Sequence, residues 1–112
     1  MTYGPHIELN VIVSEHARFH HSPLYAEIVR RAHKRGLAGA SVFRGIEGFG
    51  HSQRVHEAHV IELAAHTPVM LVIVDAESRI REFLPELRQL VGDDVVVTLR
   101  TVELLAPAIG RR

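Results

Sequence analysis

The chain has 112 residues, enough for one small domain with its own core, and it combines 46% hydrophobic with 23% charged residues, as soluble globular proteins do. Its 13 basic and 13 acidic residues balance, and aromatic residues make up only 5%, which argues against a nucleic-acid-binding surface. There is no Cys, no signal peptide and no apolar run of ~18 residues, so we expect a cytoplasmic protein without disulfides, thiol chemistry or direct membrane insertion.

The first predicted elements are a strand and a helix. Residues 6–14 alternate apolar and polar side chains, which is typical of a strand with one buried face. A helix is predicted over residues 23–35, with Ser22 as its N-cap and Pro23 as its first residue. Gly36 is expected to end it, because glycine readily adopts the left-handed conformation of a helix C-terminus.

Three further strands are predicted. Residues 37–45 are rich in small and β-branched side chains and form the second strand. Residues 69–74 are apolar throughout, which favours a third strand buried on both faces. The fourth strand covers residues 95–105. Residues 55–65 fit neither period, and an extended arm or a short helix remains open for them.

The second helix follows the third strand. Asp75 is expected to cap it, and Gly92 to end it. Pro85 lies inside the pattern and should kink the helix or split it, because proline removes a backbone hydrogen bond.

The element order β-α-β-β-α-β predicts an α+β fold of the ferredoxin-like type, a split βαβ sandwich with two helices on one face of an antiparallel sheet. We expect a single domain over residues 1–112, with a core at about 6–105, a loop at about 46–60 and a tail at 106–112. Two helices cover only one sheet face, yet apolar residues remain for the other, which predicts an oligomer that packs through the sheet. These residues are Ile12, Met70, Val72, Val74, Val96, Val102 and Leu104.

The stretch RGIEGFG joins the second and third strands. Its G-x-x-G-x-G spacing is neither a Rossmann nor a Walker pattern. The glycines permit positive φ or a close approach of the backbone to a ligand, although a simple turn explains them as well. Arg44 and Arg54 flank the stretch and are candidates to hold an anion.

Histidines are the second candidate group. His51, His56 and His59 lie close together after the glycines and are a candidate set for zinc, copper or nickel, although they match no metalloprotease pattern. Solvated loop histidines are the simpler interpretation. No thiol, nucleophile elbow or carboxylate pair indicates catalysis, so we expect a protein that is not an enzyme.

The segment RFHHSPLYAEIVRRAHKRGLAGASVFRGIEGFG resembles domain-of-unknown-function family 190. Members share R-[YF]-H-x-x-P-L-Y, matched here by Arg18, Phe19, His20 and Pro23-Leu24-Tyr25. They also share G-[LI]-A-G-A-[ST]-V-x-R-G-I-x-G-[FY]-G, matched by residues 36–50. The resemblance extends over residues 6–105.

That family is similar to the PII signalling proteins, which are ferredoxin-like trimers that bind adenine nucleotides between subunits. A long loop in those proteins contacts a regulated transporter or enzyme. The resemblance therefore implies a PII-like regulatory homotrimer that senses a small ligand, with an adenine nucleotide as the candidate ligand. It also implies a protein partner, such as a membrane transporter or channel. The implied ligand-binding residues are Arg18, His20, Arg44, Gly45, Gly48, Phe49, Gly50, His51, Gln53, Arg54 and His56.

One part of the chain departs from the PII pattern. PII proteins close their phosphate site with a glycine- and lysine-rich connection before the last strand, where this chain has Gly92-Asp93-Asp94. Acidic side chains repel a triphosphate. A monophosphate, a cyclic nucleotide or no nucleotide fits better, unless Arg100, Arg111 and Arg112 replace the missing cations. The alternative implied by the same fold is a divalent-metal-binding trimer like the CutA proteins, which would use the loop histidines.

Overall fold

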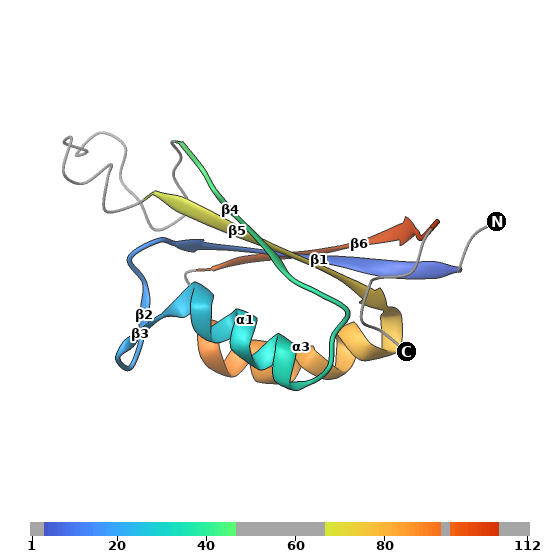
Figure 1. Cartoon of the computed structure of the whole chain (residues 1–112), viewed down its shortest axis with the longest axis horizontal. Helices are drawn as coiled ribbons and strands as arrows, with labels where there is room; N and C mark the ends of the chain where they lie inside the picture. The colour runs from blue at the N-terminus through green and yellow to red at the C-terminus, as the bar shows by residue number, and fades with distance from the viewer. Residues whose placement is uncertain (1–3, 47–66, 93–94, 106–112) are drawn as a thin grey trace.

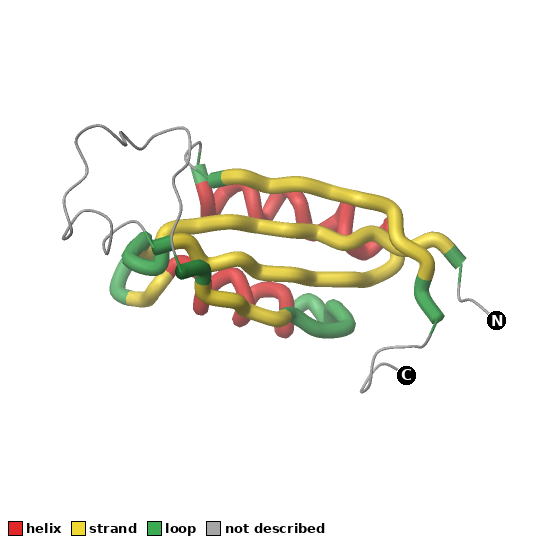
Figure 2. The backbone as a smooth tube through the Cα atoms, turned by 90° about the horizontal axis from the view of Figure 1, so that it is seen from above, coloured by secondary structure: helices red, strands yellow, loops and turns green. Residues whose placement is uncertain are grey.

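One antiparallel sheet carries two helices on the same face, as Figures 1 and 2 show. The computed structural model describes residues 4–46, 67–92 and 95–105. Its elements are β1 (Pro5–Ser14), β2 (Arg18–Phe19), β3 (Ser22–Pro23), α1 (Leu24–Lys34), β4 (Ser41–Arg44), β5 (Pro68–Ala76), α3 (Glu77–Val91) and β6 (Val96–Glu103). The sheet order is β4-β5-β1-β6, with β1 and β5 in the centre. The predicted ferredoxin-like α+β fold is confirmed.

The core lies between the sheet and the helices. Alternate residues of β1 are buried, and its register pairs Leu9 with Ile73 and Val11 with Leu71 of β5. Each large apolar side chain buried in this way contributes about 1.5–3 kcal/mol. The helices supply the facing side chains, which are Leu24, Ile28 and Ala32 from α1 and Ile80, Phe83 and Leu87 from α3. Neither helix in the described ranges is long and apolar enough to cross a membrane.

The start of α1 differs from the prediction. The helix begins at Leu24, and Pro23 occupies the N-cap position without a side-chain hydrogen bond. Ser22 does not cap it, because Ser22 pairs with Phe19 in a small hairpin of β2 and β3. The end is as predicted: Gly36 has a φ of 75°, which only glycine adopts without strain.

The start of α3 differs for another reason. Asp75 lies inside β5 and is 1% exposed, and its Oδ2 accepts the backbone N–H of Ala38 at 3.0 Å. Ala76 therefore occupies the N-cap position, without a side-chain cap. The helix then runs unbroken through Pro85 to Gly92, so the predicted split is wrong. Pro85 and Arg81, the residue whose carbonyl loses its partner, are both exposed.

Two strand predictions also change. The second strand is shorter than 37–45, because Leu37 donates its N–H to Ala32 and only Ser41–Arg44 pair with β5. In the single chain β5 is fully buried on one face rather than on both. Its other face is half-buried and lies away from the helices, and none of the described helices covers that side of the sheet.

Candidate functional site

The end of β4 and the start of β5, which flank positions 47–66 in the chain, lie side by side at one end of the sheet (Figure 1). The backbone N–H of Gly45 donates to the carbonyl of Pro68 at 2.7 Å. The N–H of Glu15 donates to the carbonyl of Thr67 at 2.8 Å. The end of β4, the start of β5 and the turn after β1 are thus hydrogen-bonded to one another. We call the residues Glu15, Arg44, Gly45, Thr67 and Pro68 the loop base.

Gly45 is required at the loop base by space. A Cβ atom at this position would lie 2.6 Å from Cγ and 3.3 Å from the carbonyl oxygen of Pro68. Contacts that short do not occur without a shift of the chain. One role predicted for this glycine is a close approach of the backbone to a ligand, whereas the close neighbour of Gly45 in the structure is Pro68 of the chain itself.

An ion pair completes the loop base. Arg44 Nη2 lies 2.6 Å from Glu15 Oε2, and the Arg44 side chain is 66% exposed. An exposed guanidinium carries five N–H donors in a planar fork that suits phosphate and carboxylate. Arg44 is therefore held in place by Glu15 while its outer side remains open to solvent. Such an arginine can take an anionic group.

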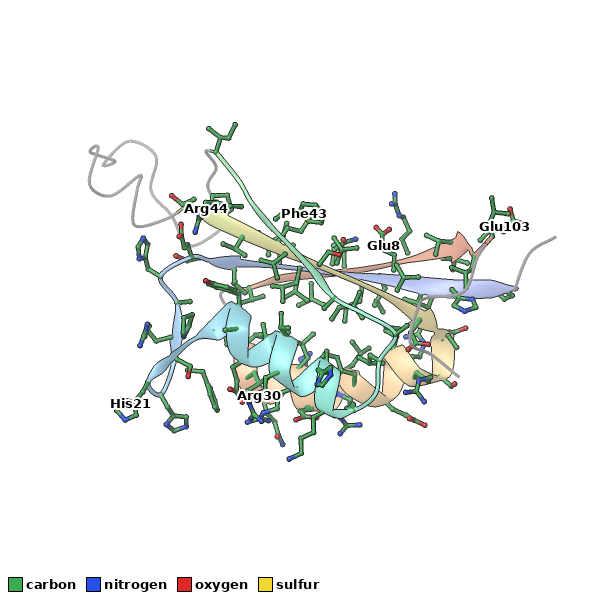
Figure 3. All side chains as sticks on the ribbon, in the orientation of Figure 1. Glu8, His21, Arg30, Phe43, Arg44 and Glu103 are labelled. Carbon is green, nitrogen blue, oxygen red and sulfur yellow. The ribbon has the colours of Figure 1, made fainter. Side chains whose placement is uncertain are left out.

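The β2–β3 hairpin is the second cluster. Arg18 pairs with Pro23 and Phe19 with Ser22, so His20 and His21 form a two-residue turn. His20 has a φ of 57°, an uncommon conformation for a non-glycine residue. Arg18 donates from Nη2 to the carbonyl of His21 across this turn. The imidazoles of His20 and His21 stand exposed at the tip, where Figure 3 labels His21.

The hairpin is braced against the helices. The Phe19 ring meets His20 edge to face at 4.4 Å, and the guanidinium carbon of Arg31 lies 5.6 Å above the Phe19 ring. Arg31 also donates to Glu27 at 2.6 Å and to Glu86 of α3 at 2.8 Å. The hairpin is thereby linked to both helices.

The neighbouring arginines lower the pKa values of Glu27 and Glu86. Hydrogen bonds from Arg30 and then Arg31 lower the pKa of Glu27 to about 2. Hydrogen bonds from Arg35 and then Arg31 lower the pKa of Glu86. Both carboxylates are therefore ionised at neutral pH, where the brace is intact.

The structure brings the described candidate residues to one end of the molecule in two clusters. Arg44 and Gly45 belong to the loop base, and Arg18 and His20 belong to the hairpin; Figures 1 and 2 show both at the same end of the sheet. The remaining candidates lie outside the described residues, namely Gly48, Phe49, Gly50, His51, Gln53, Arg54 and His56, as does the metal alternative of His51, His56 and His59. In the described ranges no three His, Asp or Glu side chains gather as a metal site.

Sequence reasoning missed several members of these clusters, among them Glu15, Thr67, Pro68 and Arg31. Glu15, Pro68 and Arg31 act through partners that are distant in the chain, such as Arg44 for Glu15. No local pattern joins these positions. The one signal for this site available in the sequence was Glu15, the acidic residue directly after the first strand.

Comparison with known proteins agrees with this architecture. Residues 6–104 match the model of DUF190, the family described as "Uncharacterized ACR, COG1993". A UPF0166 protein of Aquifex aeolicus is 34% identical over 97 residues, which cover 87% of this chain and 90% of the relative. A UPF0166 protein of Methanocaldococcus jannaschii is 28% identical over 91 residues, covering 81% and 83%.

Solved structures share the fold at low sequence identity. A protein of Thermus thermophilus described as PII-like has a TM-score of 0.61 at 13% identity, over 89% of each chain. CPII of Thiomonas intermedia, bound to ADP, AMP and acetate, has a TM-score of 0.57 at 13% identity, over 92% of this chain and 91% of CPII. The divalent ion tolerance protein CutA1 of Ehrlichia chaffeensis has a TM-score of 0.58 at 11% identity, over 90% and 82%. The chain therefore belongs to the DUF190 family, and its fold is the ferredoxin-like fold of PII-like signalling proteins.

Proposed function

We propose that the protein is a non-enzymatic, PII-like regulator that binds a small anionic ligand, an adenine nucleotide, next to the loop base. The observation that carries this proposal is Arg44, which Glu15 holds at the loop base, next to the described residues that flank the segment 47–66 in the chain. A ligand bound to Arg44 lies next to Gly45, Thr67 and Pro68, which flank that segment in the chain. It can therefore change what the segment presents to a protein partner.

Support for the ligand class comes from a protein of the same fold. CPII of Thiomonas intermedia has been solved with ADP and AMP. In this chain we assign the phosphate to Arg44, and we place Arg18 and His20 of the hairpin at the edge of the same site. The other proposed contacts are Gly45, Gly48, Phe49, Gly50, His51, Gln53, Arg54 and His56. The acidic pair Asp93-Asp94 favours a monophosphate or cyclic nucleotide over a triphosphate.

We propose a cytoplasmic homotrimer as the working form, with a membrane transporter or channel as the regulated partner. The uncovered sheet face supports the oligomer. Of the apolar residues predicted to lie beyond the core, all but Leu104, which follows the end of β6, belong to register rows on the face away from the helices. Exposed apolar patches of this kind are typical of association surfaces.

Isothermal titration calorimetry with AMP, cyclic AMP, ADP and ATP tests the ligand. Sedimentation velocity and circular dichroism first establish that the sample is folded and assembled. We expect AMP or cyclic AMP to bind more tightly than ATP, and Arg44→Ala to weaken binding at least tenfold. Arg81→Ala serves as the control, because Arg81 pairs with Glu77 on the surface of α3. If the folded oligomer binds none of the four nucleotides, the nucleotide proposal is refuted.

A divalent metal is the second candidate ligand. It is favoured by the shared fold with CutA1, described as a divalent ion tolerance protein, and by the three histidines at positions 51, 56 and 59. Thermal unfolding with zinc, copper and nickel, before and after chelation, tests it. An increase in Tm that disappears in the His56→Ala/His59→Ala variant supports the metal. An increase that survives these substitutions, or no increase, contradicts it.

A further inference from the structure

The sheet face away from the helices carries an apolar row across all four strands. The strand register places Phe43 opposite Met70, Met70 opposite Ile12, and Ile12 opposite Val96. Phe43 is 54% exposed, Ile12 37% and Val96 44%. We call these four residues the apolar row. Figure 3 shows Phe43 standing on the face opposite the helices.

The same face also carries an ion pair beside the apolar row. Arg100 of β6 lies directly opposite Glu8 of β1, and its Nη2 donates to Glu8 Oε2 at 2.9 Å. Asn10 donates to the same carboxylate oxygen at 3.0 Å. The Glu8 side chain is 19% exposed, whereas that of Arg100 is 68% exposed. Figure 3 places Glu8 on the same side of the sheet as Phe43.

We infer that a second copy of this chain covers this face, and that the Glu8–Arg100 pair sets the orientation in which the copies pack. The inference rests on the proposed homotrimer and names the residues that specify it. A copy of the chain is the partner that fits, because this face presents one carboxylate beside one guanidinium, and the described strand positions in the same register rows add no further Asp, Glu, Lys or Arg. Nucleic acid or an acidic protein would require a basic excess.

The apolar row by itself does not define one arrangement. Side chains repeat on a sheet face every second residue, so two packed sheets can slide by two residues and still present the same faces. An apolar surface tolerates such a slip at low cost. Because Glu8 and Arg100 belong to the same chain, a slip moves the pair as a unit against the apolar row of the neighbour. Such a slip buries an ion pair and leaves the outer N–H groups of Arg100 without acceptors, which is unfavourable. The pair therefore disfavours the packing of two copies in any other register.

Arg100 also has donors to offer the neighbour. A guanidinium carries five N–H groups, and Glu8 takes one of them through Nη2. In the assembled protein we expect the outer N–H groups of Arg100 to reach polar side chains of the adjacent copy. Removal of Arg100 then leaves Glu8 buried in the interface without its cation.

Two adjacent valines provide a matched test of the face. Val96 and Val97 are 44% and 39% exposed and stand on opposite faces of β6, because Val96 pairs with the exposed Ile12 and Val97 with the buried Val11. We expect Val96→Glu to dissociate the oligomer in sedimentation velocity at micromolar concentration, while Val97→Glu leaves it assembled. Equal behaviour of the two variants overturns the assignment of the face.

Two arginines provide a matched test of the ion pair. Arg100→Met should raise the dissociation constant of the oligomer at least tenfold, whereas Arg81→Met, which breaks an exposed pair on α3, should leave it within twofold. The double variant Glu8→Met/Arg100→Met should associate again but show more than one oligomeric state in native mass spectrometry. A single state identical to that of the wild type overturns the orienting role. A monomeric wild type refutes the homotrimer and this inference together, whereas an assembled wild type unaffected by Val96→Glu refutes only this inference.

Discussion

Arg44 Nη2 lies 2.6 Å from Glu15 Oε2, and this contact joins the end of β4 to the turn after β1 across 29 positions of sequence. The pair lies beside the hydrogen bonds that join Gly45 to Pro68 and Glu15 to Thr67. Its energy as a surface ion pair is small, about 0.2–1 kcal/mol. Its position gives it a different importance, because Glu15 competes with any anionic ligand for Arg44.

Glu15→Gln should therefore tighten the binding of AMP. The substitution removes the negative charge beside the bound phosphate, while the side-chain oxygen of Gln can still accept a hydrogen bond from Arg44, and we expect the affinity to rise about two- to fivefold. The free energy of unfolding should fall by less than about 1 kcal/mol. Calorimetry measures the first change and urea denaturation the second. Glu82→Gln, at an exposed position of α3, is the control, and a weaker affinity in Glu15→Gln would contradict the competition.

Gly45→Ala should destabilise the loop base. The added methyl group would lie 2.6 Å from Pro68 Cγ, so the strand ends must move apart, at a cost of about 1–3 kcal/mol. Gly39→Ala is the matched control, because a Cβ at Gly39 meets nothing within 4 Å. Urea denaturation of both variants should show a clear loss for Gly45→Ala only. Equal stabilities would mean that Pro68 yields without cost.

Acid should unfold the protein partly through Glu27. Its folded pKa, about 2, lies below the ordinary value of 4.5, so ionised Glu27 stabilises the folded state above about pH 4.5. This contribution is lost as the pH falls from 4.5 toward 2. Urea midpoints across this range should fall less steeply in Glu27→Gln than in the wild type. The same slope in both would show that other carboxylates dominate acid unfolding.

Glycine substitutions at the two neighbouring histidines of the β2–β3 turn should differ in their effect on stability. His20 is the one non-glycine residue in the described ranges with a positive φ, at the first position of a two-residue turn that usually takes glycine there. His20→Gly should relieve strain and exceed His21→Gly in stability by about 1 kcal/mol. Thermal unfolding compares them, and a less stable His20→Gly would mean that contacts of the His20 ring outweigh the backbone strain.

Much of the fold could be predicted from local patterns. The alternation of β1 identifies its buried face, which the register with β5 then confirms. Gly36 and Gly92 end the two helices with positive φ, as expected from glycine alone. These features are local, because strand alternation and helix termination depend on side chains a few residues apart.

The helix starts could not be predicted in the same way. Ser22 and Asp75 are both good capping residues, and each is used elsewhere. Ser22 pairs with Phe19 in the hairpin, and Asp75 accepts the N–H of Ala38, which lies 37 positions earlier in the chain. A capping preference is worth only about 1 kcal/mol, so a tertiary contact easily replaces it.

Local patterns in the chain were enough to establish the order of the elements, the two faces of β1 and the family motif that contains Arg44 and Gly45. What those two residues touch depends on the folded sheet. Glu15 and Pro68 lie beside Arg44 and Gly45 only because strand pairing brings distant parts of the chain together. Contacts between distant positions produce no periodic pattern in a single sequence. Strand pairing also aligns Phe43, Met70, Ile12 and Val96 in one row on the sheet face away from the helices. This row could not be predicted from the four strand sequences, because it depends on their register.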